Sequence, residues 1–305
     1  MVNRQQEFKQ AVADILGRPC NEINSAPERV ESIKKILIKC PTGKMLLDWA
    51  DQNNVEIWID HQIEGGGLMI GEVNTVLISH HSTDEDAAII LAHELHHVYQ
   101  DSLGLIPLSF NNIQDYVAMA VLSEAGAYAV CGQVVKELEN ECEIYSRAYL
   151  EQQLGIIFAD SEWKDESILG CIFKSFISSD HGYQNKLHYL EEVCDALNDT
   201  SQKTNSFHSE YLNKGLAFKY NNNAKPAALE YDTKSILPFG QLLNGKNFLI
   251  QDLKEYQLVS IVSYLKAFLK PERLSNRIRG DLLNAERCLE QRQTKGLGPA
   301  HIKLV

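Results

Sequence analysis

Positive charge is scarce in this chain. The 305 residues include 29 Lys and Arg against 41 Asp and Glu, which gives a formal net charge of −12. Proteins that bind nucleic acids in general need Lys and Arg to neutralise the phosphates. The composition therefore argues against a nucleic-acid partner.

Cysteine patterns that would form a disulfide framework are also missing. The seven cysteines are an odd number, they are widely spaced, and no two of them form a C-x-x-C pair. This complement is typical of a reduced, cytosolic protein. It also argues against a cysteine-rich zinc site.

Long apolar runs are lacking as well. The first residues, MVNRQQEFKQAVADILG, have no extended apolar core of the kind found in signal peptides. No run approaches the roughly 20 apolar residues of a membrane span. We therefore expect cytoplasmic synthesis without a signal peptide and no membrane span, while export by a signal-independent route stays open.

One short motif indicates a chemistry directly. His93, Glu94 and His97 form the pattern His-Glu-x-x-His. Two histidines four apart on a helix project from one face, offset by about 40° at 3.6 residues per turn. One divalent metal ion can bind both, while the glutamate beside it stays free to act as a base. His96 is expected outside the ligand set, either behind it or facing solvent.

The patterns around the motif predict a mainly α protein of the α+β class. Residues 3–53 indicate helices, and β-like runs between Val55 and Ser79 predict three short strands in a small antiparallel sheet. Ser82 with Glu85 three residues later predicts the N-cap of the motif helix. Further helices are predicted at Ile113–Leu138, Ser167–Ser178, Leu187–Leu197, Leu253–Leu269 and Glu272–Arg292.

These elements suggest three segments. We predict an N-terminal helical segment at 1–53, a catalytic core at 54–160 and a helical C-terminal region at 161–305. Residues 198–206 are polar and rich in turn formers, so they are the best candidate for a loop or linker.

A catalytic zinc site usually has three protein ligands, so one more is needed. The extended metzincin pattern fails, because Gln100 and Leu103 stand where it needs glycine and histidine. Glu124 fits best: it lies among small and apolar residues on the next predicted helix, where a buried carboxylate needs a partner. The alternatives, in falling order of preference, are two aspartates, Asp115 and Asp101, and then His181.

His93, Glu94, His97 and Glu124, the last within Ser-Glu-Ala-Gly-Ala, resemble the gluzincin arrangement of thermolysin-like zinc peptidases. Residues 55–140 resemble more closely a group of bacterial metallopeptidases that includes effector proteases of the RavK kind, which pathogens inject into host cells. The resemblance implies a zincin-like core, Zn²⁺ as cofactor, and a specialised secretion route toward a host protein target.

The sequence departs from thermolysin-like enzymes at Tyr128, where that family has an aspartate that orients a metal ligand. The supporting contacts must then come from elsewhere, with Gln100, Asp101 and Tyr128 as candidates. The candidates for stabilising the oxyanion are Tyr116, Tyr128, His181 and Tyr183.

The sequence thus predicts a zinc-dependent endopeptidase that acts on a protein or peptide substrate, with Glu94 as the general base. The glycines around Gly66–Gly71 are read either as a substrate-binding strand or as a plain hairpin turn. The alternative function is a helical protein-interaction module whose metal site is structural or absent.

Overall fold

The protein is seen in a computed structural model. It describes residues 2–17, 26–63, 66–106, 109–110, 112–141, 145–155, 163, 168–198, 229–267, 270, 274–294 and 300–301. The predicted linker at 198–206 lies outside these residues, apart from Asn198.

Among the described residues, three α-helices precede the sheet, as predicted for residues 3–53. They are α1 (Val2–Leu16), α2 (Pro27–Leu37) and α3 (Pro41–Gln52). A proline occupies the first position of both α2 and α3, where its missing N–H costs nothing. The thiol of Cys40 caps α3 by accepting a hydrogen bond from the Gly43 N–H at 3.3 Å.

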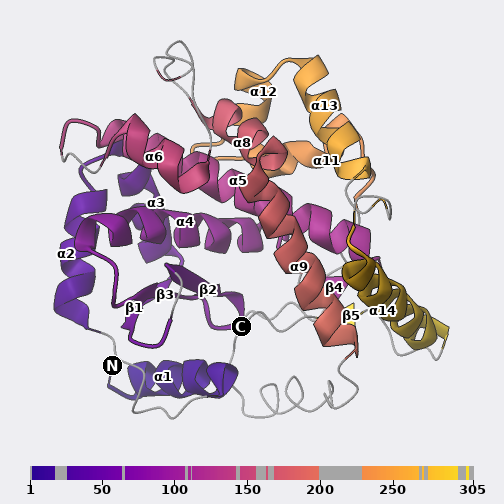
Figure 1. The fold of residues 1–305 in the computed structure, drawn as a ribbon. Helices are drawn as coiled ribbons and strands as arrows, with labels where there is room; N and C mark the ends of the chain where they lie inside the picture. Colours follow the sequence, from indigo (N-terminus) through magenta and orange to yellow (C-terminus); the bar gives the residue numbers. More distant parts are fainter. Residues whose placement is uncertain are drawn as a thin grey trace.

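The sheet has three strands, β1 (Glu56–Asp60), β2 (Gly67–Ile70) and β3 (Thr75–Ser79), in the order β1-β3-β2. β2 and β3 are antiparallel, as expected, but β1 runs parallel to β3. The prediction of a wholly antiparallel sheet is therefore wrong. The reason is that the connection after β1 leads to the opposite edge, so that β3 returns between the two earlier strands (Figure 1).

Both faces of this sheet are covered, because alternate side chains along a strand point to opposite sides. Trp58 and Leu77 pack with α1 on one face. Ile57, Ile59 and Ile78 belong to the main core on the other face, where α4 lies (Figure 1). The sheet is thus a layer between α1 and the motif helix.

The motif helix α4 (Asp84–Ser102) begins after Thr83, whose hydroxyl accepts a hydrogen bond from the Asp86 N–H at 3.1 Å. The expected N-cap, Ser82 paired with Glu85, is wrong by one residue. Serine and threonine suit this position almost equally, so the hydroxyl pattern alone does not decide between them.

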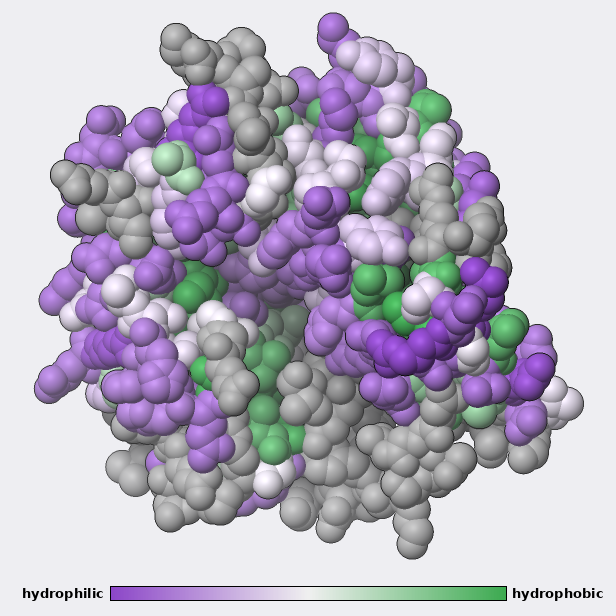
Figure 2. Space-filling view, in the orientation of Figure 1, coloured by the Kyte–Doolittle hydropathy of each residue, from purple (hydrophilic) through white to green (hydrophobic). Residues whose placement is uncertain are grey.

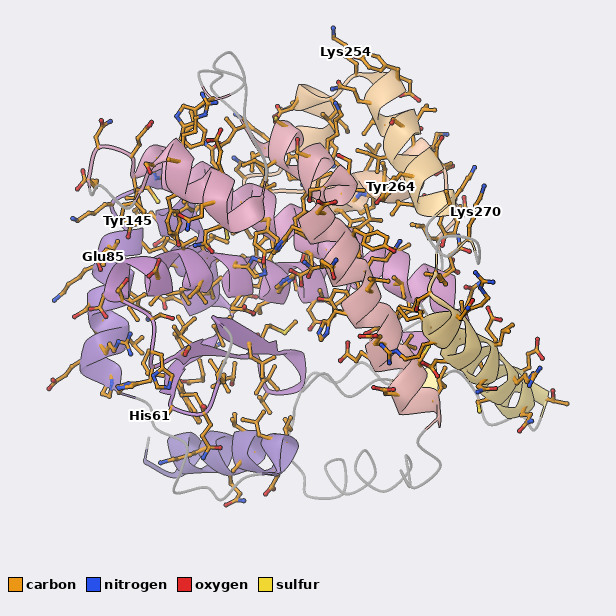
Figure 3. The ribbon with its side chains drawn as sticks, viewed as in Figure 1. His61, Glu85, Tyr145, Lys254, Tyr264 and Lys270 are labelled. Carbon is orange, nitrogen blue, oxygen red and sulfur yellow. The ribbon has the colours of Figure 1, made fainter. Side chains whose placement is uncertain are left out.

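Two neighbouring helices fasten the first turn of α4. Tyr145 donates its hydroxyl to the Glu85 carbonyl at 3.2 Å, and both residues are labelled in Figure 3. Tyr149, on α6 (Arg147–Leu154), donates to Asp86 at 2.8 Å. Arg29 of α2 reaches the same region and forms an ion pair with Asp84 at 3.1 Å.

The second long helix, α5 (Ile113–Glu137), confirms the predicted span to within a residue. It is long and apolar enough to cross a membrane by length and composition alone, and 83% of its most apolar window is buried inside the molecule. α5 packs against α4 and α8 at the centre of the main core.

The remaining elements are helical apart from one short strand pair. They are α8 (Leu169–Ser178), α9 (Asp180–Asn198), α11 (Thr233–Ile236), η3 (Leu237–Gly240), α12 (Phe248–Asp252), α13 (Glu255–Lys266), α14 (Asn276–Thr294), and β4 (Ser109–Phe110) paired with β5 (Ala300–His301). The four helices predicted in this half are confirmed. The fold class is mainly α with a small sheet, as expected, while the domain boundaries stay predictions.

Candidate metal centre

Three side chains from two helices meet at one point. α4 supplies His93 and His97, and α5 supplies Glu124. The Nε2 atom of His93 lies 3.3 Å from Oε2 of Glu124, and Nε2 of His97 lies 3.2 Å from Oε1. The two Nε2 atoms are 3.0 Å apart. All three donor atoms lie within 4.8 Å of one another, a spacing that lets one metal ion contact them together.

The hydrogen bonding of His97 fits a metal ligand. The Gln100 amide donates through Nε2 to the Ser123 carbonyl at 2.9 Å, so its oxygen faces Nδ1 of His97 at 2.8 Å. A carbonyl oxygen only accepts, so Nδ1 keeps its proton, and Nε2 is the nitrogen that gives up a proton when a metal ion binds. A ligating nitrogen needs this tautomer.

The charges of the cluster balance one another. Burial alone would raise the pKa of Glu124, but the facing imidazoles of His97 and His93 hold the pKa well below its usual range. Burial alone would lower the pKa of His97, yet the charge of Glu124 raises the pKa to about 9. The carboxylate is therefore ionised, as a metal ligand has to be.

Glu94 lies beside the cluster and is held by the sheet. It is buried, and burial raises the pKa of its carboxyl group. The backbone N–H of Met69 in β2 lies on the side of this carboxylate and acts in the opposite direction, lowering the pKa. Gly67 passes so close that a Cβ there would lie 2.8 Å from Cγ of Glu94. Gly67 thus belongs to a strand that packs directly on the proposed base, not to a hairpin turn.

A cavity of about 270 Å³ opens onto these side chains. The face drawn in Figure 2 is hollowed near its middle, where Figure 1 places β2, α4 and α9. The lining residues are Gly67, Leu68, Met69, His93, Glu94, His97, Ile106, Tyr116, Ala120, Ser123, Glu124, His188, Tyr189 and Glu192.

The α9 side of this cavity was not foreseen from the sequence. The hydroxyl of Tyr189 donates to Oε1 of Glu124 at 2.7 Å, across 65 residues of sequence. His188 and Glu192 line the cavity from the same helix. These residues have the ordinary spacing of a packed helix, so no pattern in the sequence distinguishes them.

Of the four residues predicted as candidates for stabilising the oxyanion, one lines the cavity. Tyr116 lines the cavity, whereas Tyr128, His181 and Tyr183 are not among its lining residues. The ring of Tyr128 contacts His93 edge-on with centroids 4.7 Å apart, and its hydroxyl lies 3.4 Å from Nε2 of His181. Tyr128 is therefore placed to support a ligand, while the roles of the other two stay predictions.

Three other residues considered from the sequence lie away from the donor atoms. His96 is 2% exposed, so the option that it faces solvent is wrong; burial lowers its pKa to about 3. Asp115 lies beside Tyr231, and Asp101 lies against Gly71 at the β2–β3 connection. Neither aspartate joins the cluster of possible metal ligands.

The comparisons with known proteins agree with this chemistry. Residues 9–143, less than half of the chain, match the model of a family described as "Putative metallopeptidase family (DUF6782)". No curated protein and no solved structure matches the chain. The matched range contains His93, Glu94, His97 and Glu124. The match supports a metallopeptidase, which is a hydrolase that uses a metal ion, and nothing in the comparisons favours an interaction module.

Proposed function

We propose that this protein is a zinc-dependent endopeptidase of the gluzincin type. The observation that carries the proposal is the convergence of His93, His97 and Glu124 at a cavity that also exposes Glu94. Two histidines and one glutamate form a donor set found at catalytic zinc sites, which keep a fourth position open. Bound zinc supplies Lewis acidity, which polarises a peptide carbonyl and makes water a better nucleophile.

Glu94 is the general base in this proposal. It takes a proton from the attacking water and passes it to the amine that leaves. Because burial raises the pKa of Glu94, its carboxylate is a stronger base than an exposed one. The close approach of Gly67 in β2 to Cγ of Glu94 limits the room for this side chain beside the cavity.

Tyr189 is the hydroxyl that faces the donor atoms from the opposite wall. We assign it the stabilisation of the oxyanion, a role for which the sequence offered other candidates. To act in this way, the hydroxyl would exchange its bond to Glu124 for one to the developing negative charge, which a nearby hydrogen-bond donor stabilises.

The outer edge of β2 is the proposed site for the substrate backbone. β2 is an edge strand, and the Ser79 N–H donates to the Gly66 carbonyl at 2.9 Å. Groups alternate along an antiparallel strand, so the carbonyls of Gly67 and Met69 point away from β3. An extended peptide can add to this edge.

The decisive test is Glu94→Gln. We expect the variant to bind one zinc per chain and to lose at least about 10²-fold in peptide cleavage, because the base is removed and the ligands remain. Metal analysis and a peptide-cleavage assay measure the two effects. Glu85→Gln, on the same helix but outside the cavity, is the matched control. Unchanged cleavage by Glu94→Gln would refute the mechanism.

The resemblance to effector proteases extends the proposal to a host protein as substrate, reached by a specialised secretion system. Cleavage sites mapped across a host-cell lysate, with the wild type against Glu94→Gln, would name that substrate. If the protein is instead an interaction module, no new peptide termini should appear in the lysate. Wild type and Glu94→Gln should then give the same result.

A further inference from the structure

One charged residue on the α9 wall of the cavity is not used by the proposed mechanism. Glu192, on α9, lies there and accepts a hydrogen bond from the Tyr116 hydroxyl at 3.4 Å. Glu192 follows Tyr189 by about one turn of α9, and the Tyr189 hydroxyl contacts Glu124. The carboxylate of Glu192 therefore lines the same cavity as the donor atoms, about one helical turn from a residue that touches them.

Within the part of the chain that the structure describes, no Lys or Arg pairs with Glu192. No Lys or Arg is among the cavity-lining residues, and among the described residues none forms an ion pair with this carboxylate. Among the described residues, the imidazole of His188, one turn earlier on the same helix, lies near this carboxylate. Burial raises the pKa of Glu192, which reflects the cost of keeping a carboxylate partly out of water.

We propose that Glu192 selects substrates that carry a Lys or Arg side chain close to the cleaved bond. This inference rests on the proposed peptidase function and names its substrate class. The long stems of Lys and Arg reach deep into a cavity, and each extended substrate residue adds about 3.3 Å. A basic residue one or two positions from the cleaved bond can therefore reach Glu192, which lines the same cavity as the metal ligands.

The environment of Glu192 favours an ion pair between its carboxylate and a Lys or Arg of the substrate. Charges attract more strongly in a partly desolvated cavity than in open water. The chain also carries a net charge of −12, which attracts basic peptides from a distance.

A purely structural role for Glu192 makes a different prediction. As an acceptor for the buried Tyr116 hydroxyl, a glutamine would serve as well as a glutamate. Glu192→Gln thus keeps the acceptor and removes the charge, which separates the two roles. Glu191→Gln is the matched control, because Glu191 is the adjacent residue on α9, lies outside the cavity lining and pairs with Arg277.

The experiment begins with a peptide library cleaved by the zinc-loaded wild type, in which we expect Lys or Arg within two residues of the cleaved bond. Matched peptides with Lys or norleucine at that position then give two values of kcat/KM. We expect a Lys preference of about 10–100-fold in the wild type and in Glu191→Gln. In Glu192→Gln the ratio should fall toward one, with an unchanged melting temperature.

A binding measurement supplies a second readout that does not need turnover. In the Glu94→Gln background, calorimetry should show the Lys peptide binding about tenfold more weakly when Glu192 is also replaced by Gln. If the wild type cleaves without a preference for Lys or Arg, or if the preference survives Glu192→Gln, the inference about Glu192 is overturned. The proposed peptidase function is not affected by either result. If the wild type neither cleaves nor binds any peptide, the proposed function fails, and the inference falls with it.

Discussion

The side-chain amide of Gln100 decides which nitrogen of His97 is free. Its oxygen faces Nδ1, and its nitrogen is fixed by the Ser123 carbonyl of the next helix. The orientation of this ligand is therefore set by a contact between α4 and α5, where thermolysin-like enzymes use an aspartate. Such outer contacts usually tune metal affinity as well as geometry.

Gln100→Leu should lower zinc affinity by about 10–100-fold, because His97 loses the acceptor that holds its tautomer. Competition with a fluorescent chelator measures this. Gln100→Glu keeps an acceptor at the same place and should restore most of the affinity. Equal affinity in the wild type and Gln100→Leu would show that Gln100 does not control the ligand.

At the scale of elements, the corner between α8 and α9 places the second wall of the cavity. Gly182, in the first turn of α9, lies against the last turn of α8. A Cβ there would come within 2.0 Å of the Phe176 carbonyl oxygen. Because the clash is with backbone, no side-chain rotation relieves it, and the two helices must separate.

Gly182→Ala should lower the free energy of unfolding by about 1–3 kcal/mol, the usual cost of overpacking. Urea denaturation measures the change. Gly280→Ala is the control, since a Cβ at that helical position meets nothing within 4 Å; there we expect no loss, or a gain of about 0.5–1 kcal/mol. A Gly182→Ala variant as stable as the wild type would show that α8 and α9 can separate at little cost in the free energy of unfolding.

At the scale of the whole molecule, a bound metal would join the two central helices. Its ligands come from α4 and α5, so the unfolded chain cannot present them together. A ligand that binds only the folded state stabilises it by about 2.7 kcal/mol at 100 times its Kd.

We therefore expect chelation to lower the melting temperature of the wild type and added zinc to restore it. Glu124→Ala should bind less than one zinc per chain and lose this response. Calorimetry with and without a chelator measures it. A zinc-dependent rise of the same size in Glu124→Ala would place the third ligand elsewhere.

The local parts of the site could be predicted from the sequence because they depend on helix spacing. His93, Glu94 and His97 share one helix, and Glu124 stands out by its apolar neighbours. Tyr189 reaches Glu124 only because α9 docks on α5, and docking depends on packing that no short pattern encodes. The parallel pairing of β1 depends likewise on the path of the chain after Asp60.

The proposed base and metal ligands lie on α4 and α5, inside the range that matches the family, whereas Tyr189 and Glu192 lie on α9, outside it. In these proposals the metal ligands and the base are encoded apart from the selectivity residue Glu192, which shares α9 with the proposed oxyanion donor Tyr189. A mutation at Glu192 would then change the preferred bond while the metal ligands and the base stay intact. Relatives that share residues 9–143 could therefore cleave different substrates by the same chemistry.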